Sequence, residues 1–131
     1  MRTSPRSPVG RWRWLGWLTT AALLQAEDAG KPPPVFAACH VCHEPAGNNK
    51  LGPNLAGIFG RKAGTVPGFR YSRAMARAKI VWEEKSLDEF LADPQRLVPG
   101  NIMPYPGLAD ERQRKALIEY LKTLDPPEAA R

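Results

Sequence analysis

The pentapeptide Cys39-His40-Val41-Cys42-His43 constrains this chain more than any other feature, because it contains both of the cysteines. Two thiols three positions apart lie on the same face of one helical turn, and a histidine follows them directly. Such a pattern has four chemical uses: a redox-active disulfide, a structural disulfide, a zinc site, or the covalent attachment of a c-type haem.

The surrounding sequence favours haem attachment over the other three uses. A redox disulfide needs a βαβ context, and no strand pattern precedes Cys39. A zinc site needs a further pair of ligands, and the only other histidine is His40, inside the motif. A structural disulfide has no need of His43. We therefore predict that Cys39 and Cys42 form thioethers with a haem and that His43 ligates its iron, whereas His40 points outward.

An iron that only transfers electrons needs a second axial ligand. Outside residues 1–26, Met75 and Met103 are the only thioethers, and no histidine lies outside the motif. Met103 lies in the proline-rich stretch 98–107, which suits a stiff loop that holds a side chain against a metal. Met75 lies in a short helical pattern, where methionine usually packs in a core. We predict Met103 as the second ligand, and His/Met ligation raises the reduction potential.

The N-terminal 26 residues have the make-up of a secretory signal peptide. Four arginines and no acidic residue precede an uncharged stretch of eleven residues, 14–24, and the small residue Ala26 follows. At about 1.5 Å per residue this stretch is too short to cross a hydrocarbon core of about 30 Å. We expect cleavage after Ala26 and export, in a bacterium to the periplasm, with membrane attachment if the signal is retained.

Loss of this segment changes what the charge implies. The full chain of 131 residues carries a formal net charge of +6, which suggests nucleic acid or an anionic surface as a partner. Removal of residues 1–26 takes away four arginines and leaves 105 residues with a net charge of +2. We therefore expect no nucleic-acid partner.

Helical patterns dominate the remaining sequence, and the scarcity of Val, Ile and Thr argues against an all-β fold. The predicted helices cover residues 34–43, residues 72–79, a segment that a capping box Ser86–Glu89 opens and Pro94 ends, and residues 111–124 after the cap Asp110. The glycine-rich stretch 44–70 is predicted to be a long loop, and such loops are uncommon unless they wrap something.

These patterns predict one small all-α domain over residues 34–125. A flexible proline-rich segment, 27–33, precedes it and a short tail, 126–131, follows it. Because so short a helical chain buries only a modest apolar core, a covalent haem in its centre would supply the missing buried surface.

Further motifs follow the cysteine turn in a characteristic order. They are Gly52-Pro53-Asn54-Leu55, Ile58-Phe59-Gly60-Arg61-Lys62, Pro67-Gly68-Phe69-Arg70-Tyr71-Ser72, Trp82, Pro99-Gly100 ahead of Met103, and Leu117-Ile118 before Tyr120-Leu121. From Val35 to Leu124 the chain resembles the class I c-type cytochromes, in the branch of mitochondrial cytochrome c and its soluble bacterial counterparts. The resemblance implies the class I cytochrome c fold, with short helices and long loops around one covalent haem c and its iron.

The resemblance also implies roles for residues around the haem. The carbonyl of Pro53 corresponds to the acceptor of the ring N–H of the ligand His43, a bond that orients the imidazole and raises its basicity. Tyr71 and Trp82 correspond to donors to a buried haem propionate. Arg61 corresponds to a cation near the same propionate.

Several positions near the second ligand depart from the family pattern or extend it. Asn101 and Tyr105 flank Met103, where the family has a small polar residue and an aromatic beside the haem edge. Phe90 stands where many members have a tyrosine near the methionine sulfur, and phenylalanine cannot donate a hydrogen bond to it. Met75 stands where many have an asparagine, so the internal polar network should be smaller. The resemblance further implies a packing contact of Val35 and Phe36 with Tyr120.

The charge near the second ligand bears on the partners. Mitochondrial members dock through a ring of lysines around the haem edge. That ring is largely missing here, because the residues near Met103 are Gln95, Ile102, Ala109 and Asp110, with only Arg96 and the more distant Arg112 positive. Residues 45–82 contain seven Lys or Arg and no acid, which we interpret as a solvated basic face. We therefore expect docking that depends only weakly on salt.

The function implied is that of a monomeric one-electron carrier between respiratory or photosynthetic redox proteins. It would be no enzyme, bind no small-molecule substrate, and meet membranes only through membrane-bound redox complexes or a retained signal. Two other classes stay open. One is a haem enzyme or sensor whose labile methionine lets the iron bind a small molecule, and the other is a metal or disulfide module without haem.

Overall fold

The computed structural model describes residues 30–124 and residue 126. In these residues the chain forms five helices and no strand: α1 (Phe36–His40), α2 (Arg73–Arg77), α3 (Glu84–Ala92), α4 (Pro94–Leu97) and α5 (Glu111–Lys122). The all-α class is confirmed. The predicted signal peptide, residues 1–26, and nearly all of the predicted tail lie outside the described residues. No helix in the described part is long and apolar enough to span a membrane.

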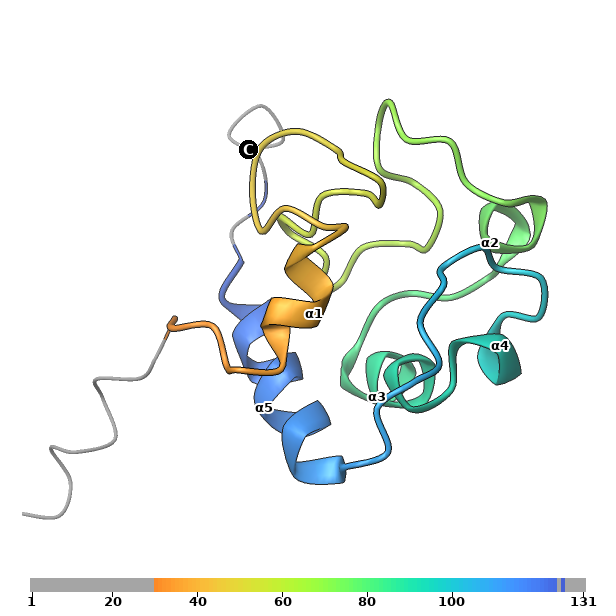
Figure 1. Cartoon of the computed structure of the whole chain (residues 1–131). Coiled ribbons are helices and arrows are strands. Elements are labelled where there is room, and N and C mark those ends of the chain that lie inside the picture. The colour runs from red at the N-terminus through yellow and green to blue at the C-terminus, as the bar shows by residue number, and fades with distance from the viewer. Residues whose placement is uncertain (1–29, 125, 127–131) are drawn as a thin grey trace, which may run out of the picture.

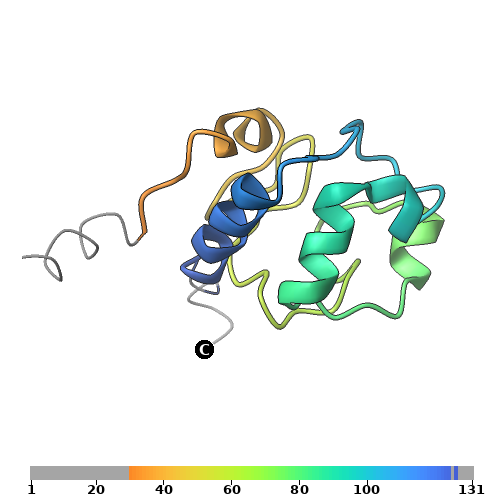
Figure 2. The same cartoon turned by 90° about the horizontal axis from the view of Figure 1, so that it is seen from below.

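The helices form two groups that the loops join (Figure 1). α1 lies beside α5, and the ring centroids of Phe36 and Tyr120 are 4.8 Å apart in an edge-on contact, as the sequence predicts. α2, α3 and α4 lie on the other side of the molecule, and α3 packs against both α4 and α5 (Figure 2). The segment between α4 and α5, which carries Met103, runs from the second group of helices back to the first (Figure 1).

The first helix is shorter than the predicted range 34–43. The amides of Phe36 and Ala37 donate to the carbonyls of Pro33 and Pro34 in a tight turn, so that regular α-helix begins only at Phe36. A proline disfavours helical backbone in the residue that precedes it, so the run of prolines 32–34 prevents a longer helix at this end. The helix ends at His40, and His43 follows in a turn whose amide donates to the Cys39 carbonyl at 2.9 Å.

The boundaries of α3 and α4 correct two predictions. The capping box is formed by Glu83 and Ser86, which exchange hydrogen bonds between side chain and backbone, and not by Ser86 and Glu89. Pro94 does not simply end the segment, because it is the first residue of α4 after the cap Asp93. Proline suits that position because the first amides of a helix have no partner within it.

The other two helices begin close to where the sequence predicts. The Ser72 hydroxyl accepts from the Met75 amide, and the Asp110 carboxylate accepts from the amides of Arg112 and Gln113. Both are ordinary N-terminal caps. The predicted long loop 44–70 has no regular secondary structure, although Lys62 forms an isolated bridge with Val81.

Candidate haem site

The cysteine turn is held against the loop that follows it. The amide of Gly52 donates to the carbonyl of Cys42 at 2.8 Å, and the Lys50 ammonium donates to the carbonyl of His40 at 3.2 Å. Both thiols are free and half-buried, and burial raises the pKa of Cys39. His40 is exposed, as predicted. Within the described residues, no cluster of His, Cys, Asp and Glu could hold a bare metal ion, which gives a zinc site no support.

His43 is oriented by one short hydrogen bond. Its Nδ1 lies 2.7 Å from the carbonyl oxygen of Pro53. Burial lowers the pKa of the ring, and the Pro53 bond opposes this in part. Because the Pro53 carbonyl oxygen can only accept, Nδ1 carries a proton, and Nε2 has no hydrogen-bond partner among the described residues. A neutral imidazole with a free nitrogen is the form that binds a metal.

A pair of asparagines holds the carbonyl of Pro53 in place. The Oδ1 of Asn49 accepts from both the amide and the side-chain amide of Asn54, at 2.9 Å and 3.1 Å. The side-chain amide of Asn49 in turn donates to the Pro67 carbonyl at 3.0 Å. Sequence reasoning missed the role of Asn49, because nothing in the local pattern shows which loop residues meet.

Gly52 is the second residue that sequence reasoning missed. It is buried, and a Cβ atom built on it would lie 2.4 Å from Cε1 and 2.7 Å from Nδ1 of His43. Real Cβ atoms do not approach other atoms so closely. The backbone of Gly52 thus forms one wall of the imidazole site, and only glycine leaves room for the ring.

Gly52→Ala is expected to displace the His43 ring and weaken its bond to Pro53. Overpacking of this kind costs about 1–3 kcal/mol of unfolding free energy. The control is Gly60→Ala, where φ is +81° but no atom lies within 4 Å of the added Cβ. This variant should lower the unfolding free energy only through backbone strain. Denaturant unfolding measures the loss of stability in both variants, and the haem absorption spectrum distinguishes them, because only Gly52→Ala should change the spectrum. An unchanged spectrum in Gly52→Ala would contradict this role.

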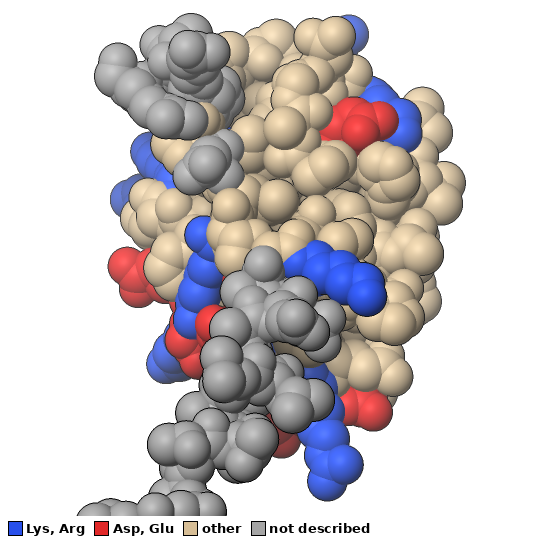
Figure 3. Space-filling model, turned by 90° about the vertical axis from the view of Figure 1, so that its left-hand side faces the viewer, with Lys and Arg blue, Asp and Glu red and all other residues tan. Residues whose placement is uncertain are grey.

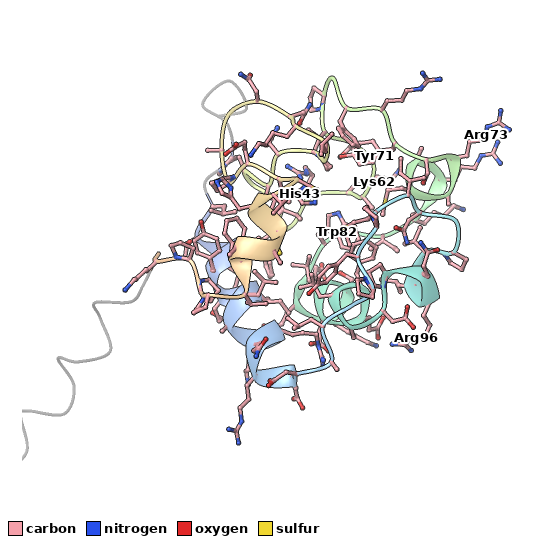
Figure 4. All side chains as sticks on the ribbon, in the orientation of Figure 1. His43, Lys62, Tyr71, Arg73, Trp82 and Arg96 are labelled. Carbon is pink, nitrogen blue, oxygen red and sulfur yellow. The ribbon has the colours of Figure 1, made fainter. Side chains whose placement is uncertain are left out.

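Tyr71, just before α2, and Trp82, between α2 and α3, each carry a hydrogen-bond donor. The Tyr71 hydroxyl accepts from the Val66 amide at 3.2 Å, which leaves its own proton to donate, and burial raises its pKa. Trp82 is buried against Phe90, with ring centroids 4.9 Å apart, and its indole N–H has no partner among the described residues. In Figure 4 both residues and His43 lie toward the centre of the molecule. A phenol and an indole with protons to donate suit a carboxylate such as a haem propionate.

Arg61 has a different immediate surrounding from the one predicted. Its guanidinium donates to the carbonyls of Ala56 at 2.7 Å and Asn54 at 3.4 Å, so it fastens the loop that carries Pro53. The side chain is half-buried and lies within electrostatic reach of Tyr71. A role toward a propionate remains a prediction.

The loop that carries Met103 is held by Asn101. The buried side chain of Asn101 donates to the carbonyls of Pro94 and Val98, each at 2.9 Å, and accepts from the Met103 amide at 3.0 Å. Gln95 fastens the same turn, because its side chain donates to the Asn101 carbonyl at 2.9 Å. Met103 is therefore half-buried on a loop with little freedom, as the prolines around it predict.

Three further side chains that the sequence singles out are those of Tyr105, Met75 and Phe90. Burial, and in second place the nearby Cys39, raises the pKa of Tyr105, which puts the methionine loop within electrostatic reach of the cysteine turn. Met75 and Phe90 are buried in the apolar core. Met75 thus packs as the sequence predicts.

These residues fit a c-type haem. Paired thiols on one turn, an anchored imidazole, a thioether on a stiff loop and two donors suited to a carboxylate are the groups such a cofactor uses. The fold and the donor set together define a small all-α c-type haem protein. The family model for cytochrome c matches residues 30–125, and the chain belongs to the cytochrome c family.

Individual relatives agree with the family. A cytochrome c2 iso-2 of Magnetospirillum molischianum is 47% identical over 93 residues, which are 70% of this chain and 96% of that protein. A cytochrome c of Chlamydomonas reinhardtii is 42% identical over 109 residues, 80% of this chain and 96% of that protein. Among solved structures, cytochrome cH from Methylobacterium extorquens matches with a TM-score of 0.65 and 39% identity, over 67% of this chain and 90% of that one. The predicted cofactor, haem c with its iron, and the predicted activity, electron transfer, are confirmed at the level of the family.

Proposed function

We propose that Cys39 and Cys42 form the two thioethers to the haem and that His43 and Met103 are the axial ligands of its iron. When bound, the haem supplies a one-electron couple between Fe(III) and Fe(II). The observation that carries this proposal is the His43 ring, whose Nδ1 lies 2.7 Å from the Pro53 carbonyl oxygen and whose Nε2 has no hydrogen-bond partner among the described residues.

The protein's own residues then have separate tasks. Pro53 orients the imidazole and strengthens it as a donor. Asn101 holds the backbone of Met103, so that the thioether needs little reorganisation when the charge on the iron changes. Tyr71 and Trp82 donate to a propionate and hold its charge away from water. Arg61 keeps the intervening loop closed through its two carbonyl contacts.

Filling of both axial positions makes the protein a carrier and not an enzyme, because no position on the iron is left for oxygen, peroxide or a substrate. The partners are other redox proteins, met transiently. Residues 1–26 act as a signal peptide that exports the chain before haem attachment, in a bacterium to the periplasm. The domain that carries the haem extends over residues 34–125.

A redox titration followed by exposure to carbon monoxide tests this function. The purified holoprotein should titrate reversibly with a one-electron slope, and the reduced form should keep its spectrum under carbon monoxide. Rapid carbon monoxide binding by the native protein would overturn the carrier and favour a haem enzyme or sensor with a labile Met103.

A further inference from the structure

The most exposed large apolar side chains of the described chain all adjoin the proposed haem site. Leu51 is 81% exposed, Val41 69% and Ile102 68%. Val41 lies between the two cysteines, Leu51 precedes the glycine that contacts the His43 ring, and Ile102 directly precedes Met103. Isolated apolar side chains on a surface need no explanation, but three around one site mark an interaction surface.

One hydrogen bond and one electrostatic interaction link the three segments of chain that carry these residues. The Gly52 amide bonds to the Cys42 carbonyl at 2.8 Å, which sets the segment of Leu51 beside the segment of Val41. The Tyr105 side chain is within electrostatic reach of Cys39, which brings the loop of Ile102 to the same turn. We call Val41, Leu51 and Ile102 the apolar patch.

The charges beside the apolar patch cancel each other. The Lys50 ammonium forms an ion pair with Glu44 at 2.7 Å, and His40 lies 3.8 Å from the same carboxylate. In the upper right part of Figure 3, a blue and a red side chain lie next to each other within a largely tan area. The arginines that Figure 4 labels, Arg73 and Arg96, extend outward from α2 and α4. A surface without net charge complements an uncharged partner surface, not an acidic one.

We propose that the apolar patch is the docking surface for a redox protein whose own contact surface, around its cofactor, is apolar and uncharged. The proposal rests on the proposed function, because the patch frames an electron path only with haem attached at Cys39 and Cys42. Contact there removes three exposed side chains from water and brings the partner's cofactor next to the thioethers. The interface is small and dissociates quickly, as electron transfer requires.

Electron self-exchange between oxidised and reduced copies of this protein tests the proposal, because each copy presents the apolar patch to the other. One copy loses an electron and the other gains it, so no further reactant is needed. NMR line broadening in mixtures of the two forms gives the rate constant. From about 0.02 M to about 0.5 M salt we expect the rate constant to change less than about threefold, since little charge is opposed across the contact.

Two variants and a control make the test specific. In Ile102→Lys, each of the two docking copies carries a new cation in the contact, and the two cations repel. The self-exchange rate constant should therefore fall about tenfold at low salt and return toward the native value at high salt. The triple variant Val41→Ser, Leu51→Ser, Ile102→Ser should slow it by about tenfold at every salt concentration, because apolar burial is lost. Val81→Lys places the same charge on an exposed apolar position outside the patch and should behave as the native protein.

The spectrum and reduction potential of each variant are recorded first, so that a failed haem site is distinguished from a failed docking surface. If the triple variant loses its native spectrum, the single variant Leu51→Ser decides the question in its place. A native rate constant that rises more than about tenfold with salt would overturn the proposal, because like charges would then face each other in the contact. Equal slowing by Ile102→Lys and Val81→Lys would overturn it as well.

Discussion

Cys42→Ala is expected to lower the yield of holoprotein by about tenfold or more, since a cofactor that binds only the folded chain contributes its binding free energy to folding. Loss of one thioether leaves the haem joined to the chain by a single bond and removes one of the two anchors that hold it in place. The chain has few other sources of stability, because its helices are short and α1 has only five residues. The measurement is the ratio of haem-stained to total protein on a denaturing gel, after expression in a host that attaches haem.

A matched control lies in the same turn. His40→Gln changes an exposed side chain between the two cysteines and should leave the yield near native, although it removes the contact with Glu44. Cys39→Ala should behave as Cys42→Ala does. Normal haem staining in both cysteine variants would contradict the proposed attachment.

Met103→Ala is expected to abolish the far-red iron–sulfur band of the oxidised protein and to lower the reduction potential by on the order of 0.1–0.3 V, because axial ligands set haem potentials over a wide range. A soft thioether favours Fe(II), so its loss favours Fe(III). The reduced variant should also bind carbon monoxide rapidly. Visible spectroscopy and a redox titration measure all three effects.

Met75→Leu is the control for this variant. Met75 is the other methionine of the predicted domain and is buried in the core. Exchange of methionine for leucine at such a site costs less than about 1.5 kcal/mol of unfolding free energy, and the far-red band should persist. The opposite pattern, with the band lost in Met75→Leu and kept in Met103→Ala, would show that the ligand had been assigned to the wrong residue.

The parts of the fold that the sequence predicts well depend on local chemistry. The caps Ser72 and Asp110 act on amides within three residues, so the pattern around each is enough to place the helix start. The start of α3 was misplaced because Ser86 fits two capping boxes. The chain uses the one with Glu83, whose backbone is extended. Nothing in the sequence alone chooses between them.

The haem site, like the fold, has parts that depend on local sequence and parts that depend on distant contacts. The cysteine turn is predictable, because haem attachment requires particular residue types at set positions. The partner of His43 is predictable only from the resemblance to the cytochromes c, because every residue has a backbone carbonyl. The contact of Gly52 with the His43 ring and the hydrogen bonds between Asn49 and Asn54 depend on how an irregular loop folds back on itself. Such a loop has no sequence periodicity from which its contacts could be predicted. The role of Asn101 likewise depends on its hydrogen bonds to two segments, the carbonyl of Pro94 in α4 and the amide of Met103 in the following loop.

The sequence shows that the ring of lysines around the haem edge is largely missing, but it does not show that the surface beside the cysteine turn has no net charge. Only the structure shows that Lys50 is paired with Glu44 beside the cysteine turn and so adds no net charge there. Exposure cannot be read from the sequence either. Leu51 lies in a run of residues that otherwise anchor the loop, yet its side chain is almost fully exposed.

The central claim is that one covalent haem is held between His43 and Met103. The most direct test is the visible spectrum of the exported native protein, oxidised and reduced, with a haem-stained denaturing gel of the same sample. The account predicts haem that stays on the denatured chain, sharp α and β bands on reduction, and the far-red band on oxidation. Stained protein without the far-red band would contradict Met103 as the ligand, and colourless protein would contradict the haem site itself.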